Sequence, residues 1–346
     1  MIYIKINLTG GIDVKFTDII PNICEGFPFE KGDFVLLNFW GDNEDLKILD
    51  LISENLSKKG IIPSKHHCSN SFFEKVVLNL IDNNLETPEE YLRYLSSFNQ
   101  VIDIFMYPPS LPNGVSESSI PKFKKYLGEL FNSLTENKKY YIQINVPTEI
   151  NASKAGLDYD IYNWALCNAL SVNFPKLKKF CKEKVESLRD KNSIEILTGK
   201  EYSLKLDINN REWFIDDGCG DFPPGEVYIA PIENNSNGDL LVSMVNLKGQ
   251  IYRDVLMTFK DGKFMKSSSK KLTEFFNSLP ENFRILCEFG IGLNPEVKDL
   301  TGISSIDEKS LGTYHIGLGM NHLFGGENNC PFHMDFVFTC DDIIFS

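Results

Sequence analysis

The stretch DFVLLNFWGDNEDLKILDLISENLSKK, residues 33–59, places a strand-like run directly before a helical one. Residues 33–40 form a short apolar run, which predicts a strand. Residues 44–59 repeat leucine and isoleucine at helical spacing, which predicts an amphipathic helix. A strand followed at once by a helix is the repeating unit of an α/β fold with a mainly parallel sheet.

The same alternation continues through the first half of the chain. Further strands are predicted at 2–8, 101–107 and 139–146, and further helices at 71–83, 87–98 and 120–134. Residues 157–190 are predicted to be helical through two stretches, 158–170 and 174–190. We therefore expect an N-terminal α/β domain over residues 1–191.

The pattern changes at about residue 192. From there, short β-like runs are separated by turns rich in glycine, asparagine and aspartate, with one clear helix at 270–279. A chain of 346 residues also exceeds the usual size of a single hydrophobic core. We expect a second domain over residues 192–346, which is β-rich, of the α+β class, and carries the metal site.

The composition narrows the class of protein. Hydrophobic residues make up 42% of the chain and charged residues 24%, which is typical of a globular protein in water. The chain has no apolar run long enough for a membrane span, and its start lacks the pattern of a secretory signal. We therefore expect a cytoplasmic protein that binds no membrane. The eight cysteines form no CxxC pair, which favours free thiols.

The charge distribution points to cations rather than nucleic acid. The net charge of −13 would repel phosphates, so no nucleic-acid partner is expected. Residues 201–346 contain 12 Lys and Arg against 22 Asp and Glu, so most of the excess lies in the second domain. The motifs GxSxG, P-loop and HExxH, which mark other enzyme classes, do not occur in the sequence.

Three of the five histidines, His315, His322 and His333, lie near the end of the sequence. His333 and Asp335 are two residues apart, so on a strand both side chains point to the same face. An imidazole beside a carboxylate suits a divalent cation, but the same pair also occurs as a structural contact.

Three glutamates stand in comparable settings. Glu226 follows two prolines and a glycine that stiffen its backbone, Glu288 precedes a glycine-rich turn, and Glu308 precedes His315 in a glycine-punctuated segment. A turn cap, a salt bridge or a hydrogen-bonded core histidine would each explain one of them. Together, six candidates would suffice for two metal ions: Glu226, Glu288, Glu308, His315, His333 and Asp335.

Four ordered segments resemble one known family. They are FPPGEVYIAP (222–231), EFGIGLNP (288–295), DEKSLGTYHIGLG (307–319), and FGGENN leading into HMD (324–335). They resemble the metallo-aminopeptidases of the aminopeptidase T, aminopeptidase S and PepS type, also called thermophilic or leucyl aminopeptidases. The resemblance implies a C-terminal domain with two divalent ions of zinc, cobalt, manganese or magnesium, a homodimer, and hydrolysis of the N-terminal residue from peptides with a free N-terminus.

The resemblance also implies roles for the candidate residues. It assigns one ion to Glu226, His333 and Asp335, a bridging role to Glu288, and the second ion to Glu308 and His315. Several members of the family have a functional tyrosine seven residues after the histidine that corresponds to His315. This sequence has His322 there, so His322 becomes the catalytic candidate. Glu233 is another possible proton shuttle.

Two other functions remain open at the sequence level. A ring-cleaving dioxygenase with one ferrous ion would use two histidines and one carboxylate on a similar scaffold. A non-catalytic relative would bind peptides without cleaving them. Glutamate at both 226 and 288 favours a carboxylate-rich, dinuclear hydrolytic site.

Overall fold

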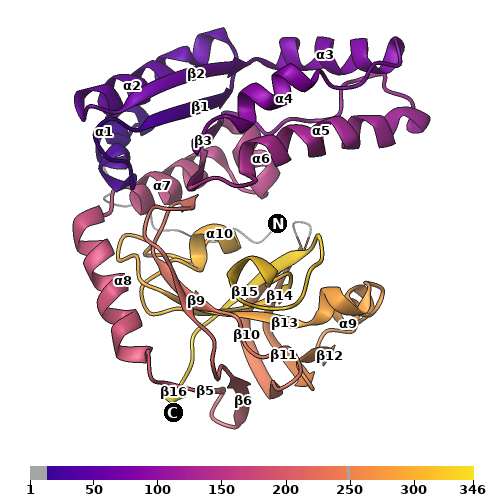
Figure 1. Cartoon of the computed structure of the whole chain (residues 1–346). Coiled ribbons are helices and arrows are strands. Elements are labelled where there is room, and N and C mark those ends of the chain that lie inside the picture. Colours follow the sequence, from indigo (N-terminus) through magenta and orange to yellow (C-terminus); the bar gives the residue numbers. More distant parts are fainter. Residues whose placement is uncertain (1–13, 248–249) are drawn as a thin grey trace. The chain divides into compact units, whose positions relative to one another are not determined.

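The computed structural model describes residues 14–247 and 250–346 (Figure 1), so the predicted strand at 2–8 lies outside the described residues. The described chain divides into two compact units. The first consists of residues 14–171 and 218–222, and the second of residues 172–217 and 223–346.

The division differs from the predicted boundary at 191/192, because residues 172–191 fall in the second unit and residues 218–222 in the first. Helix α8 (Phe174–Leu188) belongs to the second unit, where it contacts β7 (Trp213–Asp216) and β9 (Glu226–Ile229). None of the described helices combines the length and the apolar character needed to cross a bilayer.

The first unit is built on one parallel sheet, sheet A, with the strand order β2-β1-β3-β4-β8. Every strand pair in it is parallel, which confirms the predicted α/β class. Its inner strands β1 and β3 are buried along nearly their whole length, as expected for a parallel sheet. The strands are β1 (Phe34–Trp40), β2 (Ile62–Cys68), β3 (Gln100–Phe105), β4 (Tyr140–Asn145) and β8 (Asp221–Phe222). The α-helices are α1 (Phe16–Gly26), α2 (Leu46–Lys58), α3 (Asn70–Asp82), α4 (Glu89–Ser96), α5 (Ile120–Thr135), α6 (Glu149–Ala155) and α7 (Tyr159–Leu170).

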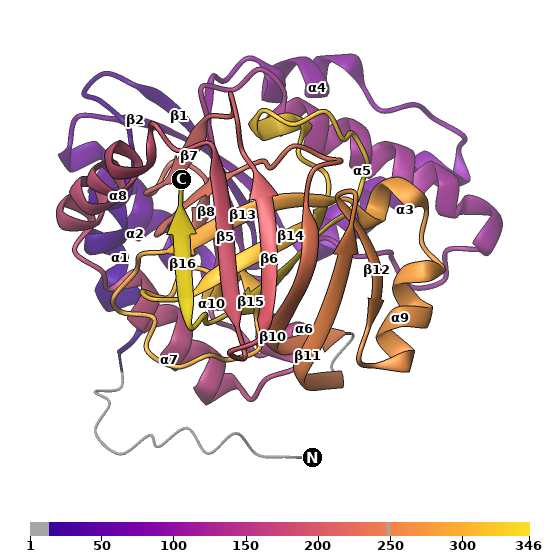
Figure 2. The ribbon, with the colours of Figure 1, turned by 90° about the horizontal axis from the view of Figure 1, so that it is seen from below.

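The second unit contains two antiparallel sheets, as the β-like runs predict. Sheet B has the order β12-β11-β10-β6-β5-β16, and Figure 2 shows these strands side by side. Its strands are β5 (Ser193–Thr198), β6 (Tyr202–Asp207), β10 (Asn237–Leu247), β11 (Gln250–Lys260), β12 (Lys263–Ser267) and β16 (Asp342–Phe345).

Sheet C has the order β15-β14-β13-β9-β7 and carries the candidate site. Besides β7 and β9, it contains β13 (Leu286–Gly292), β14 (Tyr314–Gly319) and β15 (His333–Phe338). The described part of this unit also contains the short helices α9 (Lys270–Asn277) and α10 (Ser304–Asp307). Because β13 and β14 are interior strands, side chains on one face of sheet C gather from several segments far apart in sequence.

Candidate metal centre

One face of sheet C alternates candidate ligands with glycines. In β13, Glu288 is followed on the same face by Gly290, and in β14, His315 is followed by Gly317. The strand register sets each ligand opposite a glycine, since His315 pairs with Gly290 and Glu288 pairs with Gly317. On the other side of β14, Gly317 pairs with Asp335. The sequence motifs EFGIG and HIGLG therefore form one continuous surface, on which candidate ligand side chains alternate with glycines that have no side chain.

The two glycines opposite the ligands leave space that a larger residue would fill. A Cβ atom at Gly290 would lie 2.0 Å from Cε1 of His315 and 2.1 Å from its Nε2. A Cβ atom at Gly317 would lie 2.9 Å from Cβ of Glu288 and 3.0 Å from Oδ1 of Asp335. These glycines are needed for the close approach of the ligand side chains.

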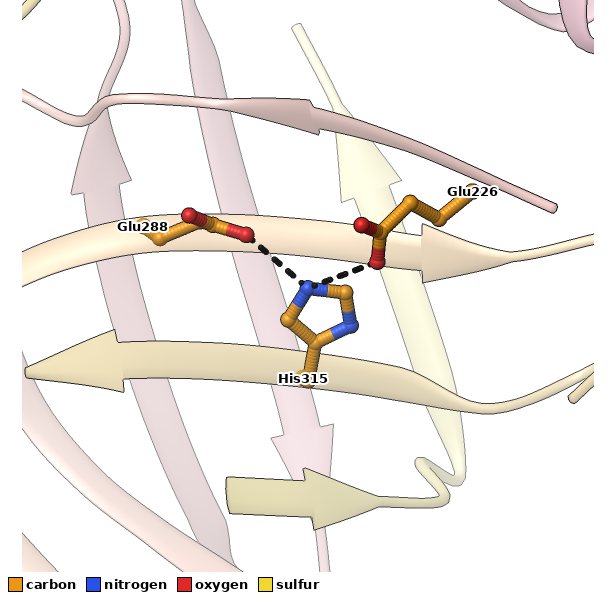
Figure 3. Close-up of side chains that lie close together, drawn as sticks. All are labelled: Glu226, Glu288 and His315. Carbon is orange, nitrogen blue, oxygen red and sulfur yellow. Dashed lines mark hydrogen bonds and ion pairs between the residues drawn. The ribbon is translucent and has the colours of Figure 1, made fainter. Parts of the chain in front are cut away.

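Glu226, Glu288 and His315 form a first buried group (Figure 3). Nε2 of His315 lies 3.1 Å from Oε1 of Glu288 and 3.4 Å from Oε2 of Glu226. One ligand atom from each of the three lies within 4.8 Å of the others. Figure 3 shows the imidazole of His315 reaching from β14 between the two carboxylates.

Glu288, His333 and Asp335 form a second group. Nε2 of His333 lies 3.0 Å from Oδ1 of Asp335 and 3.5 Å from Oε2 of Glu288. The ligand atoms of this group also lie within 4.8 Å of one another. Glu288 thus belongs to both groups through different oxygens, and this is the arrangement that a bridging carboxylate requires.

The grouping differs from the assignment implied by the family resemblance. Glu226 falls in the group of His315, whereas the resemblance places it with His333 and Asp335. Glu308 belongs to neither group, and its Oε1 lies 3.1 Å from the ammonium of Lys309 instead. Which residues fall in the same group depends on distances between side chains on different strands. The order of the motifs along the sequence gives no information about these distances.

The segment before Glu226 is held from several directions. Gly225 has φ of +130°, which favours glycine, and its N–H donates to the carbonyl oxygen of Asp216 at 2.9 Å. The amide of Asn294 donates to the carbonyl oxygen of Pro224 at 2.9 Å. Leu293 N–H donates to the carbonyl oxygen of Gly225 at 2.8 Å. Glu226 therefore starts β9 from a fixed backbone.

Lys309 is a member of the cluster that the sequence did not single out. Its side chain is only 3% exposed, and its ammonium forms an ion pair with Glu226, with Glu308, and with Asp216 at 3.3 Å. A lysine flanked by acids in the sequence looks like an ordinary surface charge, and only burial distinguishes it. The one sequence signal was the salt-bridge alternative for Glu308 in the run DEK.

Burial and mutual charge shift the pKa values of this cluster. Burial alone would lower the pKa of His315, but its hydrogen bond to Glu288 and the charges of Glu226 and Glu308 raise it to about 9. Burial raises the pKa of Glu288, and His315 opposes that shift. The pKa of Lys309 lies well above its usual range, because its carboxylate neighbours outweigh burial. The metal-free cluster therefore holds protons that a cation must displace.

A divalent cation fits the donors that the structure brings together. Oε2 of Glu226 is buried, lies 3.4 Å from Nε2 of His315, and has no hydrogen-bond partner among the described residues. Unpaired buried polar atoms are costly and call for a partner. Carboxylate oxygens and imidazole nitrogens are ligands for zinc, cobalt and manganese.

These pKa shifts predict a pH effect on the metal-free protein. The pKa of His315 is about 9 in the folded protein, against an ordinary value of 6.5. Its contribution to stability is therefore present below pH 6.5 and is lost as the pH rises through about 9. We expect the EDTA-treated protein to lose up to roughly 3 kcal/mol of unfolding free energy over this range, as measured by urea denaturation.

A matched variant isolates this effect, because His315→Gln should flatten the decline between pH 6.5 and 9. A metal-free wild-type protein that becomes more stable across this interval would contradict the prediction. Adding a divalent cation should stabilise the protein more at pH 9 than at pH 6.5, because cation binding releases protons.

His322, the catalytic candidate, is the first residue of the short 3-10 helix η4 (His322–Phe324). Its backbone N–H donates to the carbonyl oxygen of Asn328 at 3.3 Å, and its side chain is exposed. Two residues earlier, the carbonyl oxygen of Met320 lies 3.0 Å from Nδ1 of His333. The turn that carries His322 is thereby tied to a candidate ligand.

Glu233 organises this turn. Its Oε2 pairs with Arg211 at 2.6 Å, and its Oε1 accepts hydrogen bonds from the side chain of Asn321 at 2.9 Å and from the N–H of Glu327 at 2.7 Å. With both oxygens engaged, Glu233 has a structural role that the sequence-level interpretation as a proton shuttle did not anticipate.

Taken together, one unit with a parallel sheet and a second unit whose antiparallel sheet gathers carboxylates and imidazoles define the class as a metal-binding α/β protein. A family model described as thermophilic metalloprotease (M29) matches residues 15–335. The chain belongs to this family, and a divalent metal cofactor follows from that membership.

Two solved structures share the fold. Wild-type AmpT from Thermus thermophilus has a TM-score of 0.65 and 17% identity, with 95% of this chain and 94% of that chain covered. A 2,5-dihydroxypyridine dioxygenase from Pseudomonas putida KT2440 has a TM-score of 0.60 and 12% identity, with 96% and 94% covered. A comparison with curated protein sequences gave no match.

Proposed function

We propose that this protein is an aminopeptidase that removes the N-terminal residue from peptides with a free N-terminus, using two divalent cations. The observation that carries the proposal is the pair of ligand groups joined by Glu288. Membership of a metalloprotease family supports hydrolysis of peptide bonds. In this proposal Glu226 and His315 hold one cation, His333 and Asp335 hold the other, and Glu288 faces both.

The charge of the cluster supports two cations rather than one. Five carboxylates surround the site, and Lys309 offsets one of their negative charges. The remaining four negative charges equal the charge of two divalent ions when both histidines are neutral. The five carboxylates are Asp216, Glu226, Glu288, Glu308 and Asp335.

The chemistry of a dinuclear centre suits this reaction. Two divalent ions lower the pKa of water and polarise a carbonyl group, which peptide hydrolysis requires. The chain supplies the remaining functions. Glu288 fixes the spacing between the two groups, and the acidic cluster offers carboxylates to the free amine of the substrate. That requirement for an amine would restrict cleavage to the first peptide bond.

The arrangement favours a hydrolase over a ring-cleaving dioxygenase. Mononuclear ferrous oxygenases use two histidines and one carboxylate around the iron. Each of the two groups found among the described residues has one histidine and two carboxylates. Metal analysis separates the two functions: two non-redox ions per chain support the peptidase, and one iron with oxygen uptake supports the dioxygenase.

The test of the proposal is cleavage of aminoacyl chromogenic amides and unblocked peptides by protein reconstituted with zinc, cobalt, manganese or magnesium. N-acetylated forms of the same peptides serve as controls. We expect release of the first residue from unblocked peptides only. Cleavage of acetylated peptides would contradict the exopeptidase assignment, and no cleavage with any metal would favour a non-catalytic, peptide-binding relative.

We propose that His322 carries a proton during hydrolysis, because a histidine can accept and donate protons and its turn is tied to His333. His322→Ala should lower kcat by about 100-fold or more with a smaller change in KM. His322→Tyr should keep much of the activity, since the family has a functional tyrosine at this place. Steady-state kinetics measure both.

The neighbouring Leu323, which is 71% exposed, provides a control. Leu323→Ala should leave kcat unchanged. If His322→Ala were as active as this control, the proton-carrying role would be lost, and another group would have to supply it.

Homodimer formation and a cytoplasmic location, both expected in the sequence analysis, belong to the same proposal. Light scattering should give twice the chain mass of 39.4 kDa. A mass equal to one chain at micromolar concentration would remove the dimer from the proposal.

A further inference from the structure

The ammonium of Lys309 donates a hydrogen bond to one of the two oxygens of Glu226. It is bonded to Oε1, while Oε2 lies 3.4 Å from Nε2 of His315 and has no hydrogen-bond partner among the described residues. The two oxygens of this carboxylate thus face different partners. A carboxylate whose one oxygen is held by a buried ammonium group has its other oxygen pointing in a defined direction.

The backbone around Lys309 is tied to the segment that carries Glu226. The carbonyl oxygen of Lys309 accepts a hydrogen bond from the N–H of Asn294 at 2.7 Å. The side chain of the same Asn294 donates to the carbonyl oxygen of Pro224 at 2.9 Å. Lys309 and Glu226 are therefore positioned through one common residue, so their separation is set by the fold rather than by two flexible side chains.

From this geometry we propose that Lys309 is a positioning residue of the metal centre, which orients Glu226 toward His315 and thereby sets the affinity of this group for its cation. The inference rests on the proposed function, because it assumes that Glu226 and His315 are ligands. It adds a residue that binds no cation itself and acts through Glu226.

Orientation and charge predict opposite effects when Lys309 is removed. If the ammonium acted only as a nearby positive charge, its loss would strengthen cation binding, because a repulsion disappears. If it acts by orienting Glu226, its loss weakens cation binding. Loss of a residue that contacts and orients a metal ligand typically lowers metal affinity about 10-fold to 100-fold. The sign of the change therefore distinguishes the two.

The effect should be confined to one of the two groups. The ion pairs of Lys309 are with Glu226, Glu308 and Asp216. The group of His333 and Asp335 is held instead by the contact between those two side chains, at 3.0 Å. One cation should bind as in the wild type, and the other should bind more weakly.

The experiment is a titration of the metal-free, full-length protein with Co²⁺, followed by calorimetry and by the visible absorption of bound Co²⁺. We expect the wild type to bind two Co²⁺, and Lys309→Met to bind one with unchanged affinity and one about 10-fold to 100-fold more weakly. The absorption of the weakened Co²⁺ should also change, because its ligand geometry differs. Lys298→Met is the control, since Lys298 lies on the surface with its side chain 63% exposed.

Lys309→Met can fail to fold, because it leaves the carboxylate of Glu226 buried without the ammonium of Lys309. A second set of variants tests the proposal in that case. Glu226→Gln removes that charge, and the double variant Glu226→Gln with Lys309→Met removes both members of the pair. If Lys309 acts through Glu226, the double variant should bind Co²⁺ like Glu226→Gln alone. A further 10-fold loss in the double variant would overturn the positioning role.

The outcomes separate this inference from the proposed function. Two Co²⁺ bound by Lys309→Met as tightly as by the wild type, or more tightly, would overturn the role of Lys309 and leave the metal centre intact. A wild-type protein that binds no Co²⁺ would overturn the metal centre and the role of Lys309 with it.

Discussion

Glu288→Gln should abolish hydrolysis while the protein remains folded. We expect kcat/KM for aminoacyl amides to fall by about a thousand-fold or more, which corresponds to about 4 kcal/mol of transition-state stabilisation. The reason is geometric, because Glu288 is the one residue common to both ligand groups and an uncharged amide cannot serve two cations as a carboxylate does. Metal content should fall from two ions to at most one.

The fold should survive this change, because glutamine has nearly the same shape and burial already disfavours the charged form of Glu288. Urea denaturation of the metal-free variant should still show one cooperative transition, with a loss no larger than the roughly 3 kcal/mol that charged His315 contributes through its carboxylate neighbours. Glu296→Gln, which alters a glutamate paired with Lys298 on the surface, is the matched control. If Glu288→Gln still hydrolysed the substrates, the assignment of Glu288 as the bridging ligand would be wrong.

Gly290→Ala should damage both the site and the stability of the second unit. The added Cβ would lie 2.0 Å from Cε1 and 2.1 Å from Nε2 of His315, whose ring is fully buried and cannot move outward. Overpacking of this kind costs about 1–3 kcal/mol. A displacement of Nε2 by about 1 Å should lower kcat/KM by about a hundred-fold.

Gly128→Ala provides the control for this glycine substitution. Gly128 lies in α5, and no described atom lies within 4 Å of the Cβ that would be added there. Alanine favours helix over glycine by up to about 1 kcal/mol, so this variant should be as stable as the wild type or more stable. Wild-type stability and metal content in Gly290→Ala would show that the ring of His315 has room that the structure denies it.

The long, strongly patterned elements were predictable from the sequence. The apolar run of β1 and the helical spacing of α2 were both found, because each pattern is local and complete. The two helical stretches predicted within 157–190 are found as α7 and α8. The break falls where Asn173 caps α8 by accepting a hydrogen bond from the N–H of Lys176.

The elements missed by the sequence interpretation have weak local signals. Helix α1 contains Pro21, and the half-buried strand β2 includes His66 and His67 rather than an apolar run. Strand β14 carries glycine at two of its six positions, Gly317 and Gly319, and was expected only as a β or turn context. Each of these is stabilised by its neighbours, since β2 pairs along its whole length with β1 and β14 pairs with strands on both sides.

The kinds of ligand at the candidate site are already present in the sequence. His333 and Asp335 share a face because a strand alternates with a period of two, and the glycines beside Glu288 and His315 indicate a place of close approach. These are short-range features of the chain, so residue order alone reveals them.

The partition of the site depends on tertiary structure. Which carboxylate meets which histidine follows from the register of β9, β13, β14 and β15, whose residues come from parts of the chain up to about a hundred positions apart. Register is set by the packing of whole strands, so it placed Glu226 beside His315 and left Glu308 with Lys309. The burial of Lys309 has the same origin, because only the folded chain surrounds its ammonium with carboxylates and removes it from water.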